Sequence, residues 1–265
     1  MTLTLDSITL GVPDVDGAGG FYASRSSEAA GQDNSPTINL RGGGSLALHP
    51  VESLADEVGA APATNGFRGY VLSSIVTQPN EVEALLDSAV RSGATLVKPA
   101  KKQFFGEFAA TYRAPDGAVW KLAAASKKNA TPAAAQPTPT ENAVYLGVAS
   151  PKSSLPFYSA LGMTVDNDYG DKFIDFTVPE GSYRLGLLPR AGLAKDVGVD
   201  EKGEGFAAIV LTHRAPSRDD VDRLLSTAHS SGGAVIAAGA VRADGAYVGT
   251  FTDPDGHYWT VTAGN

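Results

Sequence analysis

Histidine and cysteine, the side chains that bind transition metals most readily, are scarce in this 265-residue chain. The four histidines are His49, His213, His229 and His257, and cysteine is absent, which excludes disulfides and thiolate chemistry. A metal site built on histidine would need at least two of them together with a carboxylate. His49 and His213 fall on strand-like stretches, so we expect hydrogen-bonding groups at a cavity mouth. We expect His229 on a solvated helix face and His257 in a turn, pointing outward.

Among the carboxylates, Glu107 is the one that we weigh as a general base, because it follows Phe105-Gly106 before a strand. The simpler alternative is an exposed turn carboxylate. Asp116 and Asp255 each belong to a Pro-Asp-Gly turn. We find no glycine-rich phosphate loop, nucleophile elbow or triad-like spacing, so no catalytic residue is assigned.

Aromatic residues are a more suggestive group, since they gather near residues 104–120 and again along residues 169–259. On alternating strands about half of such rings would point into a half-open barrel rather than at the covering helices. A pocket lined by rings suits a flat apolar or aromatic molecule. The structural alternative is that the rings simply fill the barrel.

The elements that must position these residues occur twice in the chain. At an offset of 139 residues and without a gap, Gly66-Phe67 falls on Gly205-Phe206, and Pro115-Asp116-Gly117 with Trp120 falls on Pro254-Asp255-Gly256 with Trp259. A register kept over so long a stretch indicates one duplicated structural unit. The period is too long for a solenoid repeat, so the duplicated unit is a domain.

Each half is predicted to contain two β-α-β-β-β modules, which makes the fold class α+β. The clearest helix begins near Asn80, which with Glu83 forms a predicted capping box, and ends at Gly93. Its repeat begins at Ser217. The residues between the halves are rich in Ala, Pro, Thr and Lys, which is typical of a semi-extended linker. The predicted domains are 1–125 and 142–265, joined by a linker over 126–141.

Composition excludes several classes of function. The formal net charge of −8, without basic runs interleaved with aromatics, argues against a nucleic-acid partner. The first residues lack a basic region followed by an apolar one, and no apolar run nears the roughly 20 residues needed to span a bilayer. We therefore expect a soluble cytoplasmic protein with no membrane partner.

The paired modules and the two terminal signatures, Ala114-Pro115-Asp116-Gly117-Ala118-Val119-Trp120 and Asp253-Pro254-Asp255-Gly256-His257-Tyr258-Trp259, resemble the vicinal oxygen chelate superfamily. The glyoxalase/bleomycin-resistance/dioxygenase type is the most similar. The resemblance implies two tandem domains whose half-open β-barrels form cups. It leaves the function open, because the superfamily includes lyases, isomerases, dioxygenases, antibiotic-modifying transferases and drug-binding proteins.

The resemblance also implies where metal ligands and ligand-binding residues would lie. The superfamily's metal positions fall near Ser7, Ala47, Val71, Lys121, Ala143, Gly186, Val210 and Thr260, and none of these is His, Asp or Glu. We therefore predict no metal and no cofactor. Phe105-Gly106 stands where the family usually has a Trp-Gly loop that closes over the ligand. The predicted ligand-binding residues are Phe105, Tyr112, His49, Trp120, Tyr247, Phe251, His213 and Trp259.

The leading hypothesis is a metal-free protein that sequesters a small hydrophobic or aromatic compound, as the family's antibiotic-resistance members do. The alternative is a metal-independent enzyme, such as an isomerase, cyclase, hydrolase or lyase, using the same cups. A metal-dependent glyoxalase or dioxygenase fits less well. Pairing of the halves within one chain would let a monomer complete its cups, and a homodimer is the alternative.

Overall fold

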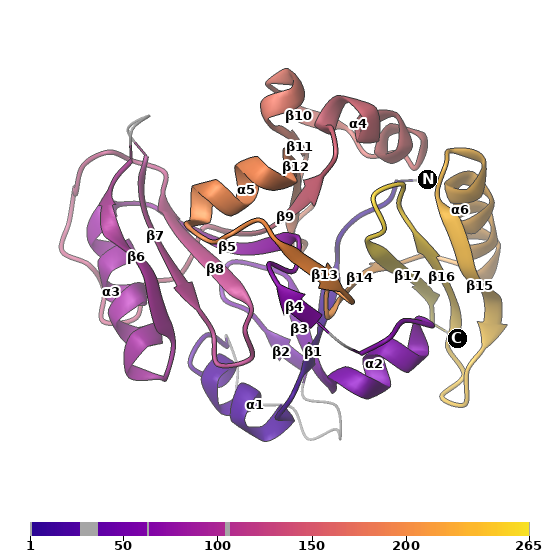
Figure 1. Ribbon diagram of the computed structural model, residues 1–265, viewed down its shortest axis with the longest axis horizontal. Coiled ribbons are helices and arrows are strands. Elements are labelled where there is room, and N and C mark those ends of the chain that lie inside the picture. The colour runs from indigo at the N-terminus through magenta and orange to yellow at the C-terminus, as the bar shows by residue number, and fades with distance from the viewer. Residues whose placement is uncertain (1, 27–36, 63, 104–106, 265) are drawn as a thin grey trace.

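The computed structural model describes residues 2–26, 37–62, 64–103 and 107–264 (Figure 1). The first half contains β1 (Ser7–Val12), α1 (Val15–Ala23), β2 (Thr37–Asn39), β3 (Ser45–Pro50), α2 (Val51–Glu57), β4 (Thr64–Gly66), β5 (Tyr70–Val76), α3 (Pro79–Arg91), β6 (Thr95–Lys102), β7 (Phe108–Arg113) and β8 (Val119–Ala124). The second half contains β9 (Glu141–Val148), α4 (Pro151–Ala160), β10 (Val165–Asp168), η1 (Gly170–Lys172), β11 (Ile174–Phe176), β12 (Arg184–Pro189), α5 (Arg190–Val197), β13 (Gly203–Gly205), β14 (Ile209–Arg214), α6 (Arg218–Ser230), β15 (Ala234–Val241), β16 (Tyr247–Thr252) and β17 (Tyr258–Ala263). This order confirms the predicted α+β class and its modular repeat.

Both large sheets combine strands from the two halves of the chain. The eight-stranded sheet has the order β10-β11-β12-β9-β5-β8-β7-β6, and the seven-stranded sheet has the order β15-β16-β17-β14-β1-β3-β2. The junctions are antiparallel, with Val71 of β5 opposite Tyr145 of β9 and Ser7 of β1 opposite Thr212 of β14. A two-stranded ribbon of β4 and β13 joins the halves again at the centre of the view in Figure 1. A site on either sheet therefore draws residues from both halves.

Alternation along the strands separates a helix-covered face from an inner face on each sheet. Ile8, Leu10 and Val12 are fully buried on the helix-covered face, as their spacing predicts. α3 packs on β7 and β8, and α6 packs on β15 and β16. The inner faces, on the other side of the sheets, are partly covered by the short helices α2 and α5, whose apolar residues pack there.

Helix α3 begins two residues earlier than its predicted start. Its N-cap is Gln78, and the Glu81 side chain accepts hydrogen bonds from the backbone of Thr77 and Gln78, so the predicted pair of Asn80 and Glu83 is wrong. Pro79 explains the difference, because proline suits the first helical position, where no amide hydrogen bond is needed. The repeat agrees, since Gln78 corresponds to Ser217, the N-cap of α6.

The residues between the halves are held against the first half. Gln78 donates to the carbonyl of Thr131 at 2.8 Å and accepts from the amide of Ala130 at 2.8 Å, and Arg41 donates to Gln136. Within the described part of the chain, no helix is both long and apolar enough to cross a membrane.

Candidate functional site

The eight positions that correspond to the superfamily's metal ligands are regrouped by the strand pairing. Val71, Lys121, Ala143 and Gly186 lie on neighbouring strands of the eight-stranded sheet, and Ser7, Ala47, Val210 and Thr260 lie on neighbouring strands of the seven-stranded sheet. Each set therefore takes two positions from each half of the sequence. The two inner faces differ in chemistry, one being charged and the other rich in hydroxyl groups.

Lys121 is the central residue of the charged inner face. Its ammonium nitrogen lies 2.8 Å from a carboxylate oxygen of Glu107 and 2.9 Å from one of Asp196. The lysine side chain is only 13% exposed, whereas both carboxylates are about two-fifths exposed. Lys121 comes from β8, and Asp196 lies in the last turn of α5, so this contact fastens α5 across the inner face.

The electrostatics keep this lysine charged. Burial alone would lower the pKa of Lys121, but Glu107 and Asp196 outweigh burial and raise it above its ordinary value. A lysine that is protonated at all physiological pH values is neither a nucleophile nor a general base. Its ammonium group instead supplies a fixed positive charge at a position where metal enzymes of the superfamily have a ligand.

An aromatic cluster adjoins Lys121 on the same face. A Cβ on Gly186 would lie 2.7 Å from Tyr145 and 3.1 Å from Phe173, so the absence of a side chain at Gly186 makes room for both rings. Tyr145 and Phe173 meet edge to face at 6.0 Å between centroids, and Tyr169 stacks on Phe173 and is 64% exposed. Burial raises the pKa of Tyr145 to about 12, although nearby Lys121 opposes the rise.

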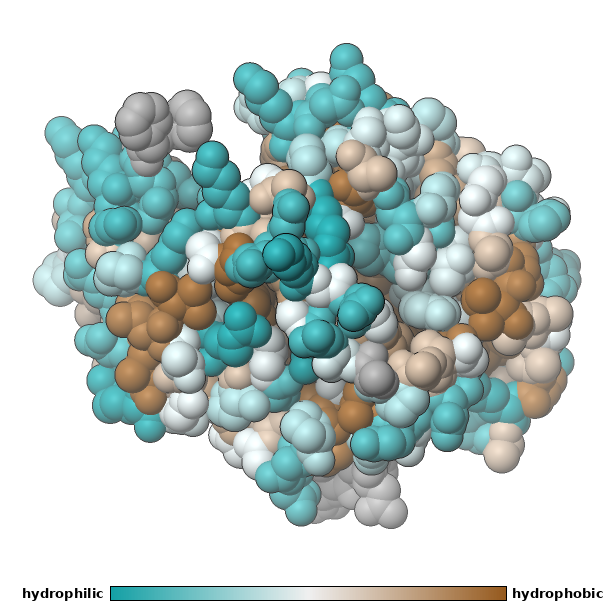
Figure 2. All heavy atoms as spheres, viewed as in Figure 1, coloured by the Kyte–Doolittle hydropathy of each residue, from teal (hydrophilic) through white to brown (hydrophobic). Residues whose placement is uncertain are grey.

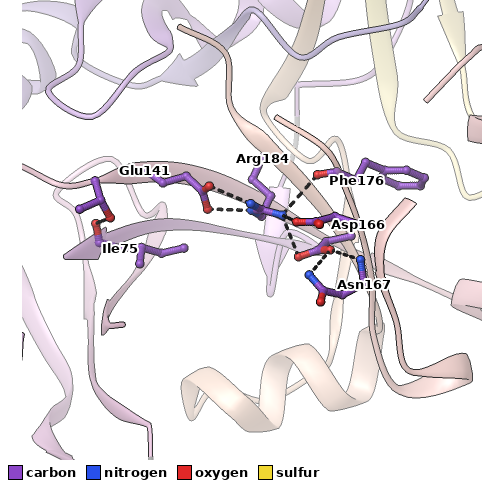
Figure 3. A network of polar contacts seen from close by, with 8 residues as sticks. Ile75, Glu141, Asp166, Asn167, Phe176 and Arg184 are labelled. Atoms are coloured by element: carbon purple, nitrogen blue, oxygen red, sulfur yellow. Dashed lines mark hydrogen bonds and ion pairs between the residues drawn. The ribbon is translucent and has the colours of Figure 1, made fainter. Parts of the chain in front are cut away.

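Arg184, the first residue of β12, forms a second charged cluster on the same face (Figure 3). Its guanidinium makes a two-pronged contact with Glu141 at 2.7 and 2.9 Å and also contacts Asp166 at 2.6 Å and Asp175 at 3.2 Å. Asp175 is buried and accepts two further hydrogen bonds from Asn167. Around Lys121 and Arg184 the named carboxylates outnumber the two cations, so this face has an excess of negative charge.

In Figure 2 the surface is hollowed at the top of the view, between the lobe of β6 and β7 and the lobe of β10 and α4.

The inner face of the seven-stranded sheet is lined mainly by hydroxyl groups. Thr212 lies opposite both Ser7 and Thr260, and Thr260 also lies opposite Thr250. These residues alternate with buried apolar ones such as Leu211 and Trp259, so they face away from the helices. This face would offer hydrogen bonds rather than charge.

Most of the predicted aromatic ligand contacts lie on the helix-covered faces, which corrects the expectation that they line the cups. Tyr112 and Trp120 stack at 6.4 Å with planes 5° apart, and Phe251 and Trp259 stack at 6.2 Å with planes 3° apart. All four are at most 1% exposed. The helix rings Phe21-Tyr22 pack on the first pair and Phe157-Tyr158 on the second. Tyr247 lies on this side too, because its hydroxyl donates to Asp222 of α6.

These rings face the helices because side chains alternate between the two faces along each strand. Trp120 and Leu122 point at the helices, so Lys121 between them must point to the inner face. A polar residue between two large apolar ones was the signal that could have identified the inner face. The inner faces instead carry Tyr145, which sequence reasoning missed, and Phe173 and Tyr258, which lie in the aromatic-rich stretch but were not selected as ligand contacts. Phe105 lies outside the described residues.

The histidines are placed as follows. His49 is partly exposed beside α2, with its Nδ1 3.8 Å from Glu57, while His229 is exposed as expected. His213 is buried on the helix-covered side, where its Nδ1 accepts from the amide of Thr4 at 3.1 Å. His257 is also buried, which corrects the expectation that it points outward. Within the described ranges, no three His, Cys, Asp or Glu side chains gather in a way that could hold a metal ion.

The comparisons with known proteins agree with this architecture. Residues 142–261 match the family model of the Glyoxalase/Bleomycin resistance protein/Dioxygenase superfamily. Glyoxalase I from Zea mays is 14% identical, with a TM-score of 0.66 over 99% of this chain and 92% of that one. A putative dioxygenase from Bacillus subtilis subsp. subtilis str. 168 is 14% identical, with a TM-score of 0.63 over 99% of this chain and 86% of that one. No curated protein matches the chain in sequence.

These findings confirm the resemblance to the vicinal oxygen chelate superfamily. Residues 142–261 match the model of this superfamily, and the whole chain shares its fold with the glyoxalase I from Zea mays. At 14% identity the similarity to the two solved structures concerns the fold alone.

Proposed function

We propose that this protein is a metal-independent small-molecule-binding protein, and that the charged inner face of the eight-stranded sheet is its binding site. The observation that supports this most directly is the Lys121 ammonium group between Glu107 and Asp196. The Lys121 ammonium group already offsets one of the two negative charges and occupies the space between the two carboxylates, so they are poor ligands for an added divalent ion.

The ligand class follows from the surrounding side chains. Tyr145, Phe173 and Tyr169 supply ring faces for a flat apolar or aromatic body. The excess of carboxylates around Lys121 and Arg184 favours a neutral or cationic ligand over an anionic one. Sequestration of a hydrophobic or aromatic metabolite or antibiotic remains the proposal, with its contacts moved to these rings.

Binding is favoured over metal-independent catalysis at this site. The pKa values of both Lys121 and Tyr145 are raised, so neither group is poised to exchange a proton near neutral pH. An enzyme that used them for acid–base chemistry would need the opposite shifts. Incubating a bound compound with the protein and looking for a change in its mass would detect turnover.

The test is calorimetric titration with three naphthalene probes that share one ring system, namely 2-naphthol, 2-naphthoate and 2-naphthylmethylammonium. At this face we expect saturable binding of the neutral and cationic probes, weaker binding of the anion, and no effect of EDTA. Only binding that is weakened by a change at Tyr145 is counted as binding at this face. Replacing Tyr145 with Ala should weaken binding at least about tenfold, because it removes a stacking surface. A matched control is Tyr247→Ala, which changes a ring on the helix-covered side of the other sheet. Binding that requires an added divalent metal would overturn the proposal, as would no saturable binding by folded protein.

A further inference from the structure

A second cleft lies between the two halves, apart from the charged inner face. It has a volume of about 370 Å³ and is bounded by the residues next to the β4–β13 ribbon and by the turn before β17. Three basic side chains converge on it from three modules: Arg68 just after β4, Arg190 at the start of α5, and His257 in the turn. A cleft with this lining contrasts with the net charge of −8 of the whole chain.

Two of these basic groups have hydrogen-bonding atoms without a partner. Nη1 of Arg68 and Nε2 of His257 are both buried, and neither makes a hydrogen bond of good geometry in the part of the chain that the structure describes, although the Arg68 guanidinium lies near the Tyr70 hydroxyl and the Asp116 carboxylate. The other terminal nitrogen of Arg68 donates to the carbonyl of Asp116 at 2.7 Å. A buried polar atom without a partner is costly, so a small rotation toward a ligand oxygen in the cleft would relieve both groups.

Arg190 is held rigidly beside the cleft. It donates to the carbonyl oxygens of Phe67 at 2.5 Å and Gly203 at 3.2 Å, and its guanidinium lies 5.2 Å from the centroid of the Phe67 ring. All of these partners are neutral, so its positive charge is not cancelled by them. The one acid in the lining, Asp255, already accepts from the amide of Ala149 at 2.7 Å and the hydroxyl of Ser154 at 2.5 Å.

The internal repeat shows that the fold does not require these basic residues. At the offset of 139 residues, Arg68 corresponds to Ala207, Arg190 to Val51 and His257 to Ala118. The repeated unit is built with a small or apolar side chain at all three positions. Their charge is therefore a property of this cleft and not of the module.

We propose that this inter-half cleft binds a small organic anion, with a carboxylate or phosphate-ester head held by Arg68, Arg190 and His257. Guanidinium groups bind such oxyanions through charge-assisted hydrogen bonds. Phe206 and Tyr258, which meet edge to face at 5.8 Å, form an apolar wall for a body about the size of one ring. The site is separate from the binding site proposed above, and it prefers the opposite charge.

The experiment titrates the full chain calorimetrically at low ionic strength with phenyl phosphate, benzoate and benzyl alcohol. We expect saturable binding of at least one anion that weakens with added salt and with Arg68→Ala, whereas any binding of the alcohol should be insensitive to both. Which anion binds more tightly identifies the head group as phosphate ester or carboxylate. Arg68→Ala should weaken the binding at least about tenfold by removing a charge-assisted hydrogen bond.

The controls separate a binding role from a structural one. Arg223→Ala makes the same change of charge at an exposed arginine and should leave the affinity unchanged. Lys121→Met should also leave it unchanged, because Lys121 lies on the inner face. His257→Ala decides the case if Arg68→Ala does not fold, since the repeat carries Ala118 at that position. Absence of saturable binding for both anions would overturn the inference, and so would unchanged affinity in a folded His257→Ala or Arg68→Ala variant.

Discussion

Replacing Lys121 with Met tests the charged centre of the inner face most directly. Methionine keeps most of the lysine chain but removes the ammonium group between Glu107 and Asp196. Truncating one partner of a fully buried ion pair costs about 3–5 kcal/mol, whereas exposed pairs contribute about 0–1 kcal/mol. The lysine is 13% exposed but its partners are 41% and 40% exposed, so the abandoned carboxylates still reach water. We therefore expect a loss of about 2 kcal/mol, between the two limits.

Urea unfolding at pH 7, followed by far-UV circular dichroism, would measure this free energy of unfolding. A loss of about 2 kcal/mol corresponds to a fall in melting temperature of about 4–8 °C for a chain of this size. Lys101→Met, at an exposed lysine of β6, is the matched control and should change stability by less than about 0.5 kcal/mol. Combining Lys121→Met with Glu107→Gln should recover about 1 kcal/mol, because one of the abandoned charges is then removed.

The pH dependence provides an independent check of the same reasoning. Because the pKa of Lys121 is raised in the folded state, its contribution is complete below the unfolded-state pKa of about 10.4. It is lost as the pH rises from there through the folded-state pKa. The native protein should therefore lose stability above pH 10.4 more steeply than Lys121→Met does. If the variant is as stable as the native protein and the two have parallel alkaline curves, then Lys121 is not held by these carboxylates.

Three further predictions concern other parts of the chain. Burial would raise the pKa of Asp6, but its polar contacts, first with His213 and then with the backbone amide of Arg214, lower it to about 2. The stabilisation by Asp6 is therefore complete above about pH 4 and is lost as the pH falls toward 2. Because Asp6 is partly exposed and water screens these contacts, Asp6→Asn should cost about 1–2 kcal/mol at pH 7 and should flatten the acid limb of a plot of stability against pH. An unchanged acid limb would contradict this. Gly186→Ala should cost about 1–3 kcal/mol, because its Cβ meets the Tyr145 ring, and should weaken naphthol binding. The control Gly192→Ala, with no contact closer than 3.8 Å, should be neutral or slightly stabilising, and equal effects of the two would refute the crowding argument. Gln78→Ala should cost about 1–2 kcal/mol and speed tryptic cleavage in the linker, because the side-chain hydrogen bonds from Gln78 to Ala130 and Thr131 are lost. Unchanged cleavage would show that these hydrogen bonds do not hold the linker.

Sequence patterns predicted the architecture well because they are local or internal to the chain. The offset of 139 residues identified the duplicated unit, and the alternation of Ile8, Leu10 and Val12 identified the buried face of β1. The same offset maps Gln78 onto Ser217, which is the N-cap of α6, so applying the repeat to the helix starts would have predicted the correct N-cap of α3. The superfamily resemblance then identified the inner-face position of Lys121.

The candidate site depended on contacts that no local pattern contains. Lys121 meets Asp196 across a separation of 75 residues, and each sheet joins strands from both halves. The sequence did not show which face of a strand its aromatic residues occupy. The contacts of α1 and α4 show that the helix-facing rings are Tyr112, Trp120, Phe251 and Trp259. Sequence alone thus determined the modules and their order, through periodicities that each segment carries by itself. Tertiary structure decided which modules share a sheet and which side chains meet, because these depend on long-range pairing between distant segments.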